Sequence, residues 1–186
     1  PDPVQQLLEE MTLEQKVGQL FLVRPDSLDL SQTQDQINDA KADGVTELTD
    51  AMRQTLAEYP VGGVVIFGKN LESPQQITQF LDDLQQASDT PLFTAIDEEG
   101  GLVARLANTA AFDLPQYESA AAVGTSGNPE DARAMGRTIG GYLKEYGFNL
   151  DFESMKTEAL PHYVQFIREL SVSCRKEGIV LSVDTY

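Results

Sequence analysis

The stretch AIDEEGGLVARL, residues 95–106, holds the residue types and spacings most suited to chemistry. An apolar run over 91–96 predicts a buried strand, and three carboxylates beginning with Asp97 follow it directly. Two glycines come next, and Arg105 stands eight residues after Asp97. Parallel α/β proteins place ligand-binding groups at the carboxyl ends of their strands, and glycines let backbone approach a ligand closely. We therefore expect Asp97 and Arg105 to belong to a binding site; the alternative is a solvated acidic turn after a strand.

Polar side chains follow the other predicted strands as well. The further strand-end groups are Arg24, Asp26, Lys69, Asn70, Asn149, Asp151, Glu153 and Asp184. In a parallel barrel, groups at the carboxyl ends of the strands meet at one mouth. A mouth lined by carboxylates, amides and a few cations suits carbohydrate hydroxyls and acid–base chemistry on a glycosidic bond.

The pair Asp151 and Glu153 has the spacing expected of a general acid and its neighbour. Residues two apart on a strand share a face, and a second carboxylate nearby raises the pKa of one of the two. The alternative is a pair of exposed carboxylates at a strand end. Mg²⁺ or Ca²⁺ would accept such ligands, but the spacing of a calcium loop is missing, and no glycine-rich phosphate loop precedes a helix. We therefore expect neither a metal nor a cofactor.

Composition narrows the classes of partner. The formal net charge of −17 argues against nucleic acid and anionic membranes as partners, and no apolar run reaches the length of a membrane span. Cys174 is the single cysteine and His162 the single histidine, which exclude an internal disulfide and disfavour a Ser-His-Asp triad. We expect a soluble protein of extracytoplasmic or secreted origin, whose start at Pro1 suggests a removed leader or tag.

Apolar strands alternate with amphipathic helices along the whole sequence. The predicted strands are 19–23, 61–67, 91–96, 148–152 and 179–183, and the predicted helices are 3–11, 12–17, 46–59, 73–88, 128–147 and 161–176. This alternation predicts parallel strands covered by helices. Since a full barrel takes about 250 residues, we expect one domain over 1–186, an α/β fold forming a partial (β/α)8 TIM-type barrel of about five strands. An open doubly wound sheet is the alternative.

Four segments resemble glycoside hydrolase family 3 over residues 3–152: MTLEQKVGQLFLV, YPVGGVVIFGKN, PLFTAIDEEGGLVARL and GFNLDF. The family consists of (β/α)8 barrels and includes bacterial β-N-acetylglucosaminidases of peptidoglycan recycling. The resemblance implies that Asp97 binds sugar hydroxyls and that Arg105 organises the same site. Lys69 and Asn149 complete the set of substrate-binding candidates.

From residue 148 to 186 the sequence resembles glycoside hydrolase family 18, the chitinase-like barrels. That family carries a DxxDxDxE pattern, and Tyr146, Asn149, Asp151 and Glu153 occupy its four positions here, so only the final DxE is retained. The resemblance implies Glu153 as general acid and Asp151 as orienter of the substrate acetamide. We interpret the chain as a chimera of a family 3-like segment over residues 1–152 and a family 18-like segment over residues 153–186.

Catalysis is expected to be incomplete, because the KHFPGHG-like segment and the late aspartate nucleophile of family 3 have no counterpart. The first hypothesis is therefore a domain that binds or acts on β-linked N-acetylglucosamine glycans of peptidoglycan or chitin type. The second is a non-catalytic scaffold or fragment that forms a homodimer through its exposed barrel edge. The third, a nucleotide-binding open sheet, is disfavoured by the missing phosphate loop.

Overall fold

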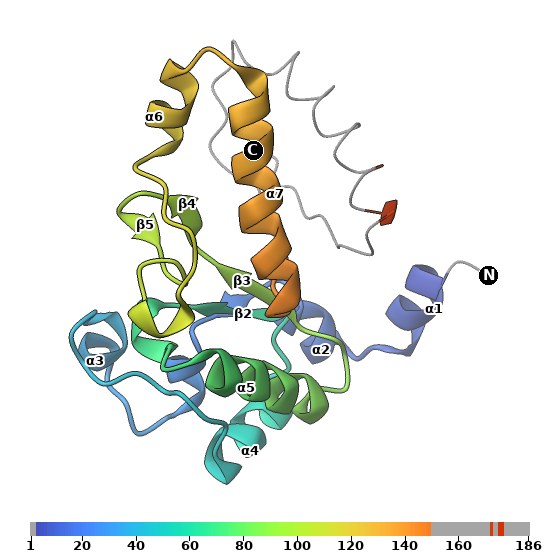
Figure 1. Ribbon diagram of the computed structural model, residues 1–186. Helices are drawn as coiled ribbons and strands as arrows, with labels where there is room; N and C mark the ends of the chain where they lie inside the picture. Colours follow the sequence, from blue (N-terminus) through green and yellow to red (C-terminus); the bar gives the residue numbers. More distant parts are fainter. Residues whose placement is uncertain (1–2, 150–171, 173–174, 177–186) are drawn as a thin grey trace.

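The computed structural model describes residues 3–149 together with Val172, Arg175 and Lys176. Its centre is a parallel sheet of three strands in the order β1 (Leu22–Val23), β2 (Gly63–Ile66) and β3 (Phe93–Ile96). Figure 1 shows α4 and α5 together below the sheet and α6 and α7 as an adjacent pair extending above it. The α/β class and the parallel sheet predicted from the sequence are confirmed.

Helices connect and cover the strands. The α-helices are α1 (Pro3–Glu10), α2 (Leu13–Gly18), α3 (Gln34–Asn38), α4 (Asp50–Glu58), α5 (Pro74–Ala87), α6 (Ala120–Thr125) and α7 (Pro129–Glu145). Short 3₁₀ helices are η1 (Pro25–Leu28), η2 (Gly68–Asn70) and η3 (Ala110–Phe112). The predicted starts of three helices are confirmed, since Thr12, Ser73 and Asn128 each accept a hydrogen bond from a backbone N–H of the first turn.

The first predicted strand, 19–23, is wrong at its start. The backbone N–H groups of Leu20 and Phe21 donate to the carbonyls of Val17 and Gly18, so they continue the last turn of α2. Only Leu22 and Val23 pair with β2. The backbone N–H groups of Leu20 and Phe21 could bond either within the end of a helix or to a neighbouring strand, and here they bond within the end of the helix.

Two other predictions need correction. The helix predicted over 46–59 begins at Asp50, because the hydroxyl of Thr49 accepts a hydrogen bond from the N–H of Met52 and so caps the helix there. The sequence predicts no helix between residues 96 and 128, but η3 and α6 lie there, and the hydroxyl of Ser119 caps α6 by accepting a hydrogen bond from the N–H of Ala122.

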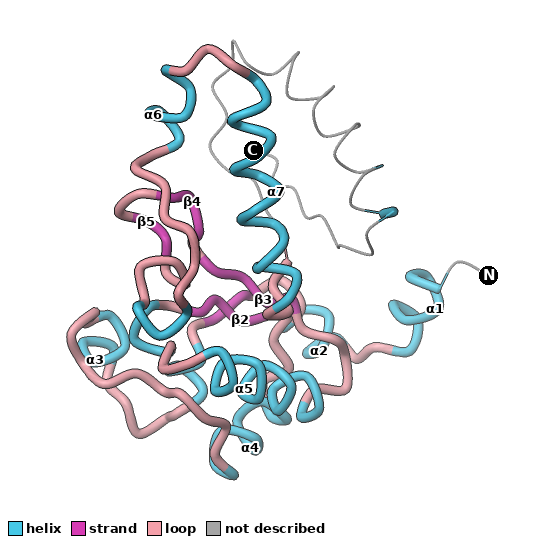
Figure 2. Tube along the Cα trace, in the orientation of Figure 1, coloured by secondary structure: helices cyan, strands magenta, loops and turns pink. Residues whose placement is uncertain are grey.

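A short antiparallel hairpin, β4 (Glu98–Gly100) with β5 (Val103–Ala104), follows β3 where the sequence suggested only a tight turn. Its turn uses Gly100 and Gly101, whose φ angles are 89° and 63°. Figure 2 shows the hairpin continuing from β3 on the side of the sheet from which α7 extends. A Cβ atom at Gly101 would collide with the carbonyl of Glu118, so this glycine serves close packing within the chain.

The core lies between the sheet and α5. The amphipathic pattern predicted for the helix over 73–88 is confirmed, because the apolar stripe of α5 is buried and packs with β2 and α4. Its main members are Met52, Leu56, Val64, Ile66, Ile77, Phe80, Leu81 and Leu84. Burial of both faces of β2 explains its continuous apolar sequence.

The five-strand partial barrel is only partly covered by the described residues. Asn149 donates its backbone N–H to the carbonyl of Thr94 at 2.8 Å, which places the start of the fourth predicted strand beside β3. Residues 150–152, the fifth predicted strand at 179–183 and most of the predicted helix 161–176 lie outside the described residues. Within residues 3–149, no helix is both long enough and apolar enough to cross a membrane.

The contact between β2 and β3 is tight enough to require glycine at position 63. A Cβ atom there would collide with the carbonyl oxygen of Phe93. Gly63→Ala is therefore expected to lower the free energy of unfolding by about 1–3 kcal/mol. Gly136→Ala in α7 is the control, since its Cβ meets no described atom within 4 Å, and we expect it to raise stability by about 0.5–1 kcal/mol. Urea denaturation of both variants checks this, and an equal effect of the two would contradict it.

Candidate functional site

Asp97 and Arg105 form an ion pair at the carboxyl end of β3. Asp97 follows the last residue of β3, and Arg105 follows the last residue of β5. The guanidinium Nη2 lies 3.0 Å from Asp97 Oδ2, and the backbone N–H of Arg105 donates to the carbonyl of Asp97 at 3.1 Å. Both side chains stay accessible, with exposed fractions of 43% for Asp97 and 32% for Arg105. The hairpin thus brings together the two residues that the sequence singled out first.

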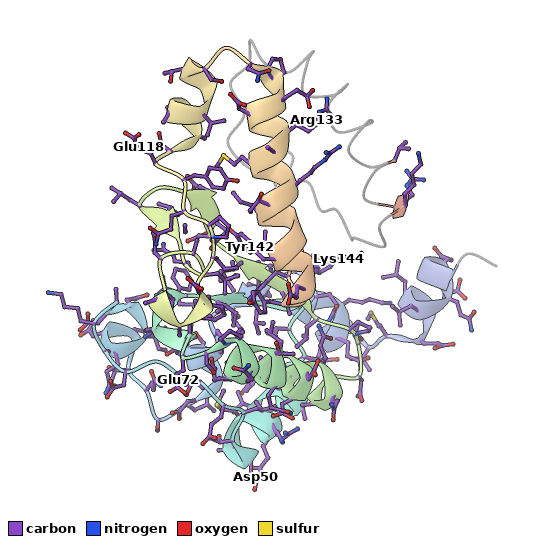
Figure 3. The ribbon with its side chains drawn as sticks, viewed as in Figure 1. Asp50, Glu72, Glu118, Arg133, Tyr142 and Lys144 are labelled. Atoms are coloured by element: carbon purple, nitrogen blue, oxygen red, sulfur yellow. The ribbon has the colours of Figure 1, made fainter. Side chains whose placement is uncertain are left out.

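Glu98, the next carboxylate, points inward and holds the hairpin in place. It accepts hydrogen bonds from the backbone N–H groups of Leu106 and Ala107 at 2.9 and 3.0 Å. It also accepts a hydrogen bond of 2.9 Å from the hydroxyl of Tyr142. Tyr142 lies on the side of α7 that faces the hairpin (Figure 3). Three donors on one carboxylate fix the chain directly after Arg105. Glu98 therefore has a structural role, whereas the carboxylate of Asp97 remains exposed to solvent.

The Tyr142 phenol gives this contact a measurable pH dependence. Burial, together with the hydrogen bond and charge of Glu98, raises the pKa of Tyr142 above its ordinary value. A group whose pKa is higher in the folded than in the unfolded protein stabilises the fold fully below the unfolded pKa, which is about 10 for tyrosine. This contribution to stability falls as the pH rises above about 10, because the phenol ionises first in the unfolded chain.

Tyr142→Phe is accordingly expected to cost about 1–2 kcal/mol at pH 7 through the lost hydrogen bond. It should also flatten the fall of stability above about pH 10. Urea denaturation of Tyr142→Phe and of the wild type between pH 7 and 11 checks this. A Tyr142→Phe curve as steep as that of the wild type would contradict it.

Lys69 lies in a buried polar cluster that ties the ends of β1 and β2 together. Its ammonium lies 3.2 Å from Asp26 Oδ1, and the Lys69 and Asp26 side chains are only 5% and 0% exposed. The ammonium also donates to the backbone carbonyls of Gln36 and Ile37, each at 3.0 Å. Asn70 donates to Asp26 Oδ2 at 2.9 Å. All of these Lys69 partners are protein groups distinct from the Asp97–Arg105 pair, so its substrate-binding role stays a prediction.

Asn149 lies beside the beginning of β3. Its Oδ1 accepts the backbone N–H of Thr94 at 2.7 Å, and the Thr94 hydroxyl donates to the carbonyl of Gly147. The amide oxygen is therefore engaged with the sheet, two residues into β3 and before its carboxyl end. Its role in substrate binding stays a prediction. Asp151 and Glu153, the predicted acid–base pair, and Asp184 lie outside the described residues.

Sequence reasoning missed the aromatic ring of Phe67. The guanidinium carbon of Arg24 lies 4.2 Å from the ring centroid of Phe67, and that of Arg105 lies 5.7 Å from it. These three residues end, or follow, three different strands. The available signal was their shared position at strand ends; Phe67 was assigned only to the apolar run of its strand.

The described region of the chain offers sugar-binding chemistry at this edge of the sheet. A half-exposed carboxylate accepts hydroxyl hydrogen bonds, a guanidinium donates them, and an aromatic ring supports the guanidinium. Within the described residues, no group of three or more His, Cys, Asp or Glu side chains could hold a metal ion.

Fold and site together define a parallel α/β, TIM-barrel-like domain with polar groups at its strand ends. The model of the glycosyl hydrolase family 3 N terminal domain matches residues 12–155. The chain therefore belongs to glycoside hydrolase family 3. The match ends three residues beyond the predicted family 3-like segment, so it includes Asp151 and Glu153.

Named relatives agree with this family. The beta-hexosaminidase A of Pseudoalteromonas piscicida is 31% identical over 113 residues, which is 58% of this chain and 19% of that protein. The beta-hexosaminidase of Thiobacillus denitrificans is 31% identical over 111 residues, 58% of this chain and 30% of that protein. A family 3 beta-N-acetylglucosaminidase from Paenibacillus sp. str. FPU-7 superposes with a TM-score of 0.59 at 31% identity, covering 77% of this chain and 24% of that structure. The chain thus spans less than a third of the length of these relatives.

Proposed function

We propose that this chain supplies an N-acetylglucosamine-binding edge of a family 3 β-N-acetylhexosaminidase-type domain. The observation that carries the proposal is the accessible Asp97–Arg105 pair at the carboxyl end of β3. Membership of family 3 and similarity to beta-hexosaminidases support the choice of sugar. The net charge of −17 fits a neutral glycan better than nucleic acid or an anionic membrane.

In this proposal Asp97 and Arg105 divide the recognition of the sugar. No described donor contacts Asp97 Oδ1, so that oxygen is free to accept a sugar hydroxyl. Arg105 orients the Asp97 carboxylate, and its guanidinium N–H groups other than the buried Nε–H donate to an adjacent hydroxyl oxygen. A pair of vicinal hydroxyls on a pyranose ring presents the matching donor and acceptor.

Titration of the 186-residue chain with N-acetylglucosamine, followed by NMR or calorimetry, tests the proposal. Saturable binding that maltose does not reproduce is the expected result. Equal responses to both sugars, or none to either, would overturn it. Peptidoglycan and chitin fragments then distinguish the glycan class.

For hydrolysis we propose Glu153 as general acid and Asp151 as orienter of the acetamide. The support is the DxE spacing of the sequence. The family 18-like interpretation of 148–186 and the chimeric origin remain predictions. A chromogenic β-N-acetylglucosaminide assay of the wild type and Glu153→Gln tests the acid: turnover lost in the variant supports it, and equal turnover contradicts it.

Self-association through an open sheet edge is a second candidate property. The predicted edge at the fifth strand, 179–183, lies outside the described residues, and β1 is an open edge within them. Among the described residues β1 pairs only with β2, and Leu20, Phe21 and Leu22 near this edge are exposed by 79%, 55% and 48%. Exposed apolar strand edges favour pairing with another chain. Light scattering should show a dimer that Leu20→Glu converts to monomer. A wild type that stays monomeric at high concentration would exclude it.

We also propose an extracytoplasmic or secreted location for the protein. A peptidoglycan- or chitin-type substrate supports an extracytoplasmic or secreted protein. Fractionation of cells that express it tests this location.

A further inference from the structure

Phe67 links two strand ends that carry guanidinium groups. It follows β2 directly, and its ring lies 4.2 Å from the guanidinium carbon of Arg24 and 5.7 Å from that of Arg105. A cation within about 6 Å of an aromatic centroid is attracted by the electron-rich face of the ring. The ring therefore contacts both the first strand end and the residue that pairs with Asp97.

Arg24 is itself fixed in place. Its Nη1 donates to the backbone carbonyl of Ile37 at 2.9 Å and to the side-chain oxygen of Asn38 at 3.3 Å. These acceptors lie at the end of α3, so the Arg24 guanidinium is held between this helix and the Phe67 ring. An anchored cation on the ring restricts the positions that the ring can take.

The Arg105–Asp97 pair uses only one nitrogen and one oxygen. Nη2 meets Oδ2 at 3.0 Å, whereas Arg105 Nε is buried and has no hydrogen-bond acceptor among the described residues. An unpaired buried donor is unfavourable, and a guanidinium beside a carboxylate ordinarily favours a bidentate pair with two parallel hydrogen bonds. Among the described residues, the other group recorded beside the Arg105 guanidinium is the Phe67 ring.

We propose that Phe67, steadied by Arg24, is a positioning residue that holds Arg105 in its single contact with Asp97, so that the second oxygen of Asp97 stays available to a sugar. This inference rests on the proposed sugar-binding function of Asp97 and Arg105. Without the ring, Arg105 turns toward Asp97 and forms the bidentate pair. The two groups then satisfy one another, and a sugar hydroxyl must compete with an internal hydrogen bond.

The first test needs no sugar. In ¹H–¹⁵N spectra of arginine side chains, Arg105 Hε should exchange slowly with water because Nε is buried. Its shift should carry the ring current of Phe67. Phe67→Leu, which keeps apolar volume without the ring, should move this resonance, and Phe67→Tyr should leave it near its wild-type position. Phe93→Leu is the matched control, an aromatic removal on the neighbouring strand.

The second test measures affinity for N-acetylglucosamine at matched thermal stability. Phe67→Leu should weaken binding about three- to tenfold, whereas Phe67→Tyr and Phe93→Leu should stay within about twofold of the wild type. Arg24→Gln should also weaken binding of N-acetylglucosamine, although it leaves the Phe67 ring in place. This variant keeps the inference testable if Phe67→Leu fails to fold.

The two tests separate the failure of this inference from the failure of the proposed function. An Arg105 resonance that does not respond to Phe67→Leu overturns the positioning role, and so does a changed resonance with unchanged affinity. A wild type that binds no N-acetylglucosamine overturns the proposed function, and the positioning of a sugar-binding Arg105 falls with it even where the resonance responds.

Discussion

Asp97→Ala is expected to abolish measurable binding of N-acetylglucosamine, a loss of at least about 100-fold or about 3 kcal/mol. Hydrogen bonds to a charged group contribute about 1.5–3 kcal/mol each, and the variant removes the carboxylate that accepts them. It also removes the only carboxylate paired with Arg105 in the described residues, so the guanidinium loses its orientation. Two binding groups are therefore affected by one substitution.

The matched control is Glu99→Ala, two residues along the chain. Glu99 is an exposed carboxylate with the same charge, and no hydrogen bond or ion pair fixes it among the described residues. Titration of both variants should give lost binding for Asp97→Ala and wild-type affinity for Glu99→Ala. Because the Asp97 side chain is half exposed, the melting temperature of Asp97→Ala should stay close to that of the wild type. Retained affinity in Asp97→Ala, or equal losses in both variants, would remove Asp97 from the site.

Asp26→Ala is expected to cost about 3–5 kcal/mol of the free energy of unfolding. Asp26 is fully buried and holds the ammonium of Lys69, the amide of Asn70 and the backbone N–H of Val45. Its removal leaves a buried ammonium without its counter-charge and two donors without an acceptor. Urea denaturation of the variant gives the size of the loss.

A surface ion pair provides the comparison. Arg53 and Asp83 approach to 3.8 Å with both side chains about a third exposed, so Asp83→Ala should cost less than about 1 kcal/mol. The double variant Asp26→Ala with Lys69→Met should recover some of the loss, because it removes the unpaired charge. An Asp26→Ala cost as small as that of Asp83→Ala would show that Lys69 regains water, contrary to its burial here.

The sequence predicted those features that depend on neighbours within a few residues. The helix starts at Thr12, Ser73 and Asn128 were predicted, because a capping side chain and the backbone N–H that it accepts lie two or three positions apart. The stripe of α5 was found because a helix repeats its faces every three to four residues. The pairing of Asp97 with Arg105 was likewise within reach, since one short hairpin separates them.

Tertiary structure decided which strand-end groups remain free. Asp26 and Lys69 are 43 positions apart, and only the alignment of β1 with β2 makes them partners and buries both. The same alignment brings Arg24 to Phe67, and the hairpin after β3 brings Arg105 to that ring. The sequence by itself therefore determined the family, the parallel strands and the candidate polar groups. Strand register decided that Asp26 and Lys69, which follow different strands, neutralise each other, because contacts between distant residues depend on alignment and not on local spacing.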